Sequence, residues 1–268
     1  MNSKIIVITG SSSGIGKATE ELLATKGYTV IGLARSFGKG SLEKFNNNIF
    51  HIHCDITNSN EVYNCIEKVI KQFHRIDILI NNAGSGITST IEDLTDEDIN
   101  NEININLKGQ IYCIRAVSRY MRKQKSGHII NIISTGGRLT YPSIPLYNAC
   151  KHAMLSITES LSWELKPWNI FITSIESGAI KTHFGKNMKR PQEDSPYSKY
   201  YQGAGKGFAT MYKKTKTSEQ VAEIIFKAIQ TKKWKYNTSF TDLVWLWSYK
   251  LLPKNVYDFI IYRYFKLK

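Results

Sequence analysis

Short apolar runs alternate with segments of helical spacing along most of this 268-residue chain. Ile5–Ile8 is a continuous apolar run, which is typical of a strand buried on both faces of a sheet. Val62, Ile66 and Val69 instead recur at the spacing of one helix face. We predict strands over Ile5–Ile8, Tyr28–Leu33, Ile49–His53, Ile76–Ile80, His128–Ile133 and Ile170–Ile175, and helices over about Gly16–Lys26, Ser59–Phe73, Asp96–Lys123 and Leu146–Leu165.

Strands that alternate with helices are joined by right-handed crossovers into a parallel sheet. The expected fold class is therefore α/β, with a doubly wound, mainly parallel, Rossmann-like sheet and helices on both faces. The chain shows no internal repeat and no linker, so we expect residues 1–268 to form one domain. A composition of 42% hydrophobic and 22% charged residues argues against a disordered chain.

The sequence predicts neither a membrane-spanning segment nor an export signal. No apolar run approaches the roughly 20 residues that cross a bilayer. Met1-Asn2-Ser3 leads directly into the first strand and leaves no room for a signal peptide. We therefore expect a cytoplasmic protein whose four cysteines, none in a Cys-x-x-Cys pair, are reduced core residues, and we expect no metal site.

The net charge of +14 is unevenly distributed. Residues 1–182 contribute only +3, whereas residues 183–217 and 232–268 contribute +6 each. Such a field can attract a nucleic acid, an anionic membrane or an anionic substrate, or it can belong to solvated surface lysines. The chain has no recognised nucleic-acid module, so we expect no nucleic-acid partner.

A glycine-rich turn, Thr9-Gly10-Ser11-Ser12-Ser13-Gly14-Ile15-Gly16, joins the first strand to the first helix. Glycines there let the backbone turn tightly and approach a pyrophosphate, and the helix N-terminus offers free N–H groups to it. A tight turn without a ligand is the alternative. If the turn binds phosphates, the expected contacts are Gly10, Ser12, Ser13, Gly14, Ile15 and Gly16.

The end of the second strand favours NADP(H) over NAD(H). NAD-binding proteins of this architecture place an acidic residue there to bind the ribose hydroxyls. Here Ala34 stands at that point, followed by Arg35 and Ser36, and no Asp or Glu lies between Glu21 and Glu43. Arg35 can pair with a 2′-phosphate through its planar fork, and Ser36 can add a hydroxyl. Alternatively, Arg35 is a solvent-facing charge.

A candidate proton-transfer group follows in the second half of the chain. Tyr147 and Lys151 are four residues apart on a predicted helix, so they lie on one face. Ser134 follows a predicted strand, at the sheet edge where such folds bind ligands. Reducing a carbonyl requires a proton at its oxygen, and an ammonium near a phenol favours the phenolate. Ser134 can hold the substrate oxygen beside Tyr147.

Together these motifs resemble the short-chain dehydrogenase/reductase family, in its branch of about 250 residues. The family carries Thr-Gly-x3-Gly-Ile-Gly at the turn and an Asn, Ser, Tyr-x3-Lys active-site pattern, which Asn106, Ser134, Tyr147 and Lys151 match. The resemblance covers roughly residues 3–184 and extends less firmly to the helix near 218–231.

The resemblance implies further roles. Lys151 would bind the nicotinamide ribose and Asn106 would hold a proton-relay water. The two long helices would form a homodimer or homotetramer interface. Ser177 replaces the family's proline after the sixth strand, which we expect to loosen that turn. The other cofactor contacts implied are Asp55 and Ile56 at the adenine, Asn82, Ala83 and Gly84 beside the cofactor, and Ile180 and Thr182 at the carboxamide.

In the family, the segment after the sixth strand forms a substrate lid, here residues 183–217, which lacks a clear period. We expect Leu139, Tyr141 and Phe184 to line the substrate pocket with Ser134 and Tyr147. The aromatic and basic residues of the lid suggest an apolar substrate that is steroid-, retinoid- or lipid-like. Alternatively, the aromatic residues only pack the lid shut.

The C-terminal tail, residues 241–268, contains eight aromatic and five basic residues and resembles an amphipathic helical segment. Two interpretations stay open. The tail lies on an anionic membrane, or it covers the substrate pocket or a subunit interface.

The favoured function is an NADP(H)-dependent oxidoreductase that moves a hydride between the nicotinamide and a carbonyl or secondary alcohol, with Tyr147 as general acid and base. A non-catalytic NADP(H)-binding sensor or scaffold is the alternative, although such a protein would not need Ser134, Tyr147 and Lys151 together.

Overall fold

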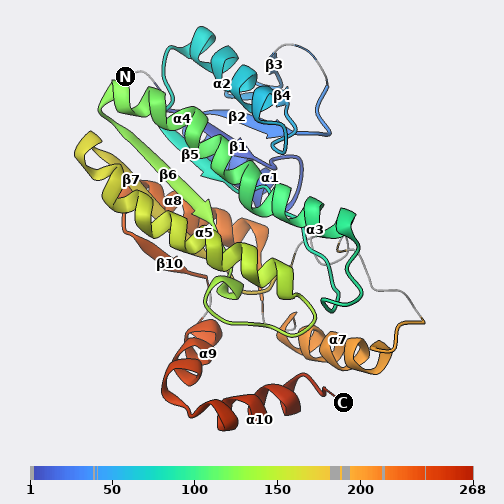
Figure 1. The fold of residues 1–268 in the computed structure, drawn as a ribbon. Helices are drawn as coiled ribbons and strands as arrows, with labels where there is room; N and C mark the ends of the chain where they lie inside the picture. Colours follow the sequence, from blue (N-terminus) through green and yellow to red (C-terminus); the bar gives the residue numbers. More distant parts are fainter. Residues whose placement is uncertain are drawn as a thin grey trace.

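The computed structural model describes residues 3–38, 40, 42–181, 188, 194–212, 215–238 and 240–267, with the backbone alone for residues 240–242. Its centre is a sheet with the strand order β10-β7-β6-β5-β1-β2-β4-β3, parallel except for the antiparallel β3 (Figure 1). The strands are β1 (Ile5–Thr9), β2 (Thr29–Ala34), β3 (Glu43–Lys44), β4 (Ile49–His53), β5 (Ile78–Asn81), β6 (Gly127–Ile132), β7 (Ile170–Glu176) and β10 (Lys235–Asn237).

Alternate residues of the central strand feed two separate cores. Ile5 and Val7 belong to one apolar cluster, whereas Ile6 and Ile8 belong to another. Successive side chains of a strand point to opposite faces, so a strand covered on both sides must be apolar at every position. The continuous apolar runs seen in the sequence follow from this arrangement.

Helices cover both faces of the sheet (Figure 1). Helices α2 (Ser59–Phe73), α4 (Gln110–Gln124) and α5 (Pro145–Glu164) pack with the first cluster. On the other face α1 (Gly14–Thr25) packs against α8 (Ser218–Thr231). The predicted doubly wound α/β class is confirmed.

Two predictions of secondary structure need correction. The expected sheet lacked β3 and β10, because two or three residues are too short to show a period. The helix predicted over Asp96–Lys123 is divided into α3 (Asp96–Ile103), a π-helical segment η1 (Asn104–Gly109) and α4. Such wide turns occur frequently at functional sites.

The helices of the lid and the tail lie beyond the ends of the strands, outside the sheet and the two helical layers that cover it (Figure 1). Within the lid, α7 (Ser198–Tyr212) is helical, and the short pair β8 (Ile180–Lys181) and β9 (Lys216–Thr217) joins the lid's two ends. The tail forms α9 (Phe240–Leu251) and α10 (Lys254–Tyr264). Within the described ranges, no helix combines the length and apolarity that crossing a membrane requires.

Candidate active site

A cleft of about 1320 Å³ runs along the carboxyl edge of the sheet, from the glycine-rich turn to α7. Each of the main parallel strands delivers a residue to it within two positions of the strand's last residue. These residues are Gly10 after β1, Arg35 after β2, Asp55 after β4, Asn82 after β5, Ser134 after β6 and Ser177 after β7. This is the edge at which open α/β sheets bind ligands.

The glycine-rich turn is fixed by contacts between backbones. Gly10 and Gly14 adopt φ of +67° and +55°, where side chains are disfavoured. A Cβ on Gly16 would lie 2.2 Å from the Gly10 carbonyl oxygen, so Gly16 packs beneath the turn and not on the cleft wall. The Asn82 side chain donates to the carbonyl oxygens of Thr9 (2.9 Å) and Gly10 (3.2 Å), which ties the turn to β5.

The wall next to this turn combines a small residue with a cation. Ala34 is buried at the end of β2, and Arg35 and Ser36 are exposed and line the cleft. Asp55 also lines the cleft, and its Oδ1 accepts hydrogen bonds from the backbone N–H (2.9 Å) and hydroxyl (2.8 Å) of Thr57. Asp55 therefore stabilises the turn after β4 while it faces the cleft.

Three of the predicted active-site side chains meet at the middle of the cleft. Tyr147 and Lys151 lie one turn apart on α5, and the Lys151 Nζ is 5.6 Å from the centroid of the Tyr147 ring. Lys151 also donates to the carbonyl oxygen of Ile132 at 3.2 Å. The Ser134 hydroxyl is hydrogen-bonded to Tyr147 and accepts from the Gly136 N–H at 3.0 Å.

Burial controls the protonation of this group. It raises the pKa of Tyr147, and the hydrogen bond with Ser134 opposes that rise. Burial lowers the pKa of Lys151 to about 8, against the attraction of the Glu102 carboxylate. We expected Lys151 to favour the phenolate. In this structure burial is the larger effect, so Tyr147 is a neutral phenol near pH 7 and has a proton to donate.

Asn106 and Leu139 lie behind the cleft wall, not on it. The Asn106 side chain accepts from the Ser85 N–H (3.2 Å) and donates to the Ser85 carbonyl oxygen (3.0 Å), so it holds the loop after β5. Leu139 is fully buried in an apolar cluster with residues of the tail. Tyr141 does line the cleft, as predicted, whereas Thr182 and Phe184 lie outside the described residues.

Glu102 is a buried carboxyl beside this site that the sequence reasoning missed. It is 0% exposed, and its Oε2 accepts from the Ser85 hydroxyl at 3.3 Å. Its Oε1 has no hydrogen-bond partner among the described residues. Burial raises its pKa to about 7, although Ser85 and Lys151 act in the opposite direction. No local signal marked it, because Glu102 stands in a polar stretch that also contains Asp98, Asn100 and Asn101.

The turn after β7 is hydrogen-bonded to the segment that follows β6. The Ser177 hydroxyl donates to the Ile133 carbonyl oxygen at 3.1 Å, and the Thr135 N–H donates to the Ser177 carbonyl oxygen at 2.8 Å. These bonds join the turn to the segment that follows β6, and the expected loosening by the loss of the family's proline stays a prediction.

Comparison with known proteins agrees with this geometry. A family model described as short chain dehydrogenase matches residues 4–193. The chain belongs to the short-chain dehydrogenase family. It is 34% identical over 239 residues to Oxidoreductase BOA17 of Botryotinia fuckeliana, covering 86% of each chain. It is 37% identical over 190 residues to 3-ketodihydrosphingosine reductase of Bacteroides thetaiotaomicron, covering 70% of this chain and 68% of that one.

Solved structures share the fold, among them that of a short-chain dehydrogenase. One from Streptomyces avermitilis matches with a TM-score of 0.82 at 24% identity, covering 97% of this chain and 95% of that one. ElxO with NADP bound matches with a TM-score of 0.72 at 25% identity, covering 90% and 99%. The chain is therefore an oxidoreductase of this family.

Proposed function

We propose that the protein is an NADP(H)-dependent oxidoreductase that transfers a hydride between the nicotinamide and a carbonyl or secondary alcohol of an apolar small molecule. The observation that carries the proposal is the placement of Ser134, Tyr147 and Lys151 together in the cleft that begins at the glycine-rich turn. The expected cytoplasmic location and the homodimer or homotetramer stay predictions.

The cleft fits a dinucleotide at its first end. Helix α1 begins at Gly14 with no side-chain cap from Ser13, so the first N–H groups of the helix can serve an anion. Gly10 and Gly14 permit the positive φ values of the turn, which let its backbone N–H groups face a pyrophosphate. When bound, the nicotinamide nucleotide supplies or accepts the hydride.

The choice of NADP(H) rests on charge. Arg35 and Ser36 line the cleft where the family binds the adenosine ribose, and Ala34 replaces the carboxylate that would repel a 2′-phosphate. A guanidinium can bind that phosphate through two N–H donors. ElxO, one of the similar structures, has NADP bound, whereas one from Burkholderia phymatum is in complex with NAD. Fold similarity therefore leaves the choice to the residues of this chain.

The proton chemistry follows from the positions of the side chains. A carbonyl oxygen placed between the Ser134 hydroxyl and the Tyr147 phenol would accept two hydrogen bonds. As negative charge develops on that oxygen, the neutral Tyr147 gives up its proton, because an alkoxide is a stronger base than a phenolate. The Lys151 ammonium then stabilises the phenolate across the ring face.

The substrate end of the cleft is mainly apolar, although Ser198 and Gln202 of α7 also line it. Beyond Tyr147 it is lined by Tyr141, Ile144, Met188 and Phe208. Such a wall favours a steroid-, retinoid- or lipid-like body and offers few groups to solvate a small polar ketone. One relative is named as a reductase of 3-ketodihydrosphingosine, and this name supports an apolar ketone as the substrate class.

The test is a Tyr147→Phe variant assayed on apolar and small ketones by NADPH and NADH absorbance. We expect kcat to fall about 10²- to 10⁴-fold, because the general acid is removed, while NADPH affinity is unchanged. The wild-type protein should prefer NADPH. Tyr63→Phe, which changes a half-buried tyrosine of α2 outside the cleft, is the matched control. Unchanged turnover in Tyr147→Phe, or a strong preference for NADH, would contradict the proposal.

A further inference from the structure

The tail exposes an apolar surface. Of the 13 large hydrophobic residues that are exposed in the described chain, seven lie in α9, α10 and their junction. Trp247 is 59% exposed, Leu251 72% and Phe259 61%. Isolated exposed hydrophobic residues are ordinary, but a contiguous patch marks an interaction surface. The seven residues are Val244, Trp247, Tyr249, Leu251, Val256, Phe259 and Tyr262.

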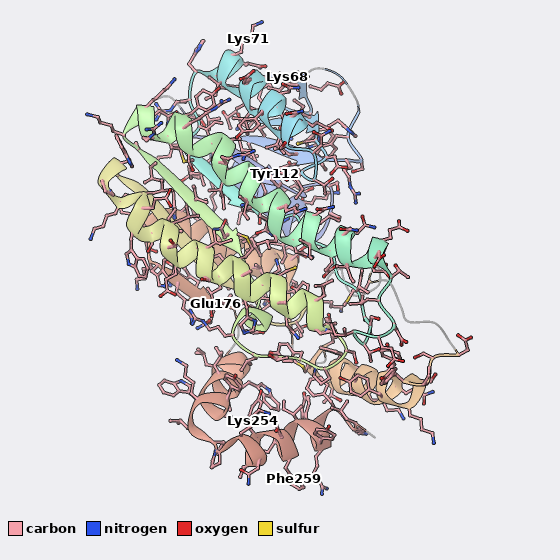
Figure 2. All side chains as sticks on the ribbon, viewed as in Figure 1. Lys68, Lys71, Tyr112, Glu176, Lys254 and Phe259 are labelled. Carbon is pink, nitrogen blue, oxygen red and sulfur yellow. The ribbon has the colours of Figure 1, made fainter. Side chains whose placement is uncertain are left out.

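These residues form the outer faces of two helices whose inner faces are already covered. Val244, Trp247 and Leu251 follow the spacing of one face of α9. Leu246 of α9 and Ile261 of α10 are buried in the cluster that also contains Leu139 and Tyr141. The exposed stripes of both helices therefore point away from the body, and Figure 2 shows Phe259 at the outer margin of α10.

Positive charge borders this outer face. Lys250, Arg263 and Lys266 are exposed, and Lys254 is 77% exposed. Asp258 is the one acidic side chain in the part of the tail that the structure describes, and it pairs with Lys254 at 2.5 and 2.6 Å. Helices that lie parallel to a membrane surface, at the level of the headgroups, typically combine Trp and Tyr with Lys and Arg.

A second copy of the chain suits the surface less well. A two-fold interface places the same patch against itself, so Lys250, Arg263 and Lys266 of each copy would meet like charges. Anionic lipid headgroups instead supply the opposite charge, and the acyl region takes the apolar stripe. Both features of the surface are thereby matched by one partner.

We propose that the outer face of α9 and α10 docks the protein on an anionic lipid bilayer. The inner face of the same two helices packs against the apolar cluster that includes Tyr141 and Phe208, both of which line the cleft. Docking would therefore hold the apolar end of the cleft near the bilayer, so that an apolar substrate enters from the lipid. The docking does not depend on the proposed reaction, but the delivery of substrate rests on it.

Co-sedimentation of the full chain with vesicles tests the docking. We expect binding at low salt to mixed phosphatidylglycerol and phosphatidylcholine vesicles, weaker binding at high salt, and little binding to phosphatidylcholine alone. A Trp247→Ser and Phe259→Ser double variant should bind at least about tenfold more weakly, because two anchors are lost. A Trp163→Ser and Phe45→Ser variant is the matched control, since these exposed residues lie on α5 and after β3.

Three results would overturn the docking. They are no binding to anionic vesicles at low salt, an equal loss of binding in the control variant, and a dimer in sedimentation velocity that only the Trp247 and Phe259 changes abolish. Turnover of an apolar ketone, assayed in solution without vesicles, should be the same in wild type and both variants. A complete lack of turnover in all three would contradict the reductase and leave the lipid result standing.

Discussion

In two regions of the molecule, glycines let another segment of the chain pack closely against them, and the consequences differ. At the cofactor end a Cβ on Gly16 would lie 2.2 Å from the carbonyl oxygen of Gly10, only six residues away. On α7 a Cβ on Gly203 would lie 2.2 Å from the Lys266 carbonyl oxygen, and one on Gly207 would lie 2.4 Å from the Phe265 ring. The second pair of contacts joins the lid to the tail across more than fifty residues.

The difference lies in how local each contact is. The glycine-rich turn is closed by backbone atoms within one short stretch, so its spacing alone indicates its shape. The glycines of α7 instead pack against residues from the end of the chain, and nothing in the local sequence identifies those residues. Substitutions in the glycine-rich turn should therefore weaken nucleotide binding, whereas substitutions in α7 should loosen the packing of the tail.

The largest effect is expected from Gly16→Ala. The added methyl group would meet the Gly10 carbonyl oxygen at 2.2 Å, and that backbone is held by Asn82, so the turn must distort. We expect NADPH affinity to fall at least about 100-fold, because the distorted turn no longer aligns its N–H groups with the phosphates. Calorimetric titration measures this loss, and an unchanged Kd would show that the turn does not hold the nucleotide.

Gly205→Ala is the control for a glycine-to-alanine change. A Cβ there meets no heavy atom within 4 Å, and Gly205 lines the α7 end of the cleft, away from the glycine-rich turn. Nucleotide affinity should be the same as in the wild type. A comparable loss in both variants would show that the effect of Gly16→Ala comes from general destabilisation.

The contrast between local and distant contacts also explains what the sequence could predict. The sheet, its crossovers and the meeting of Ser134 with Tyr147 follow from apolar runs and from the rule that parallel strands end at one edge. Leu139 was placed in the substrate pocket because it lies between those two residues, but it is fully buried in an apolar cluster that includes residues of the tail. Two of these, Ile261 and Phe265, are connected to it by no local pattern.

Local patterns also did not reveal the wide turn at Asn106. The residue lies in η1 and its side-chain amide donates to the Ser85 carbonyl oxygen, while its expected catalytic role stays a prediction. Propensities do not distinguish such a turn from an ordinary helix. The same turn follows Glu102, whose burial could not be anticipated from a polar stretch that contains Asp98, Asn100 and Asn101.

Glu102 is a buried carboxyl beside the cleft, and its ionisation destabilises the folded protein. We expect the next largest effect from this residue. Burial raises its pKa from 4.5 to about 7, so the folded protein keeps the proton that the unfolded chain loses. The stabilising contribution is complete below pH 4.5 and is lost as pH rises through 7. At about 1.4 kcal/mol for each pKa unit, the loss is about 3 kcal/mol.

Glu102→Gln removes this titration. Since glutamine cannot ionise, we expect the variant to match the wild type near pH 5 and to be more stable by up to about 3 kcal/mol at pH 8.5. Urea unfolding across this range measures the difference, in which the titrations shared by both proteins cancel. Parallel stability curves would mean that Glu102 ionises normally in the folded protein.

The smallest effect, and the one that isolates the second region, is expected from Gly207→Ala compared with Gly205→Ala. Both residues lie on α7, but a Cβ at 207 would lie 2.4 Å from the Phe265 ring and 2.9 Å from its Cα. The tail backbone must therefore move, at a cost of about 1–3 kcal/mol. At 205 the space is open, so alanine should stabilise the helix by about 0.5–1 kcal/mol.

Hydrogen exchange separates local from global effects here. In Gly207→Ala the amides of α10 should exchange faster while those of β1 and β5 keep their protection, and NADPH affinity should be unchanged. Slower or equal exchange in α10 would mean that the close contact between Gly207 and Phe265 does not hold the tail in place. If protection fell equally in β1, the tail would be part of the cofactor core, and the separation between local and distant contacts would not describe how this molecule is stabilised.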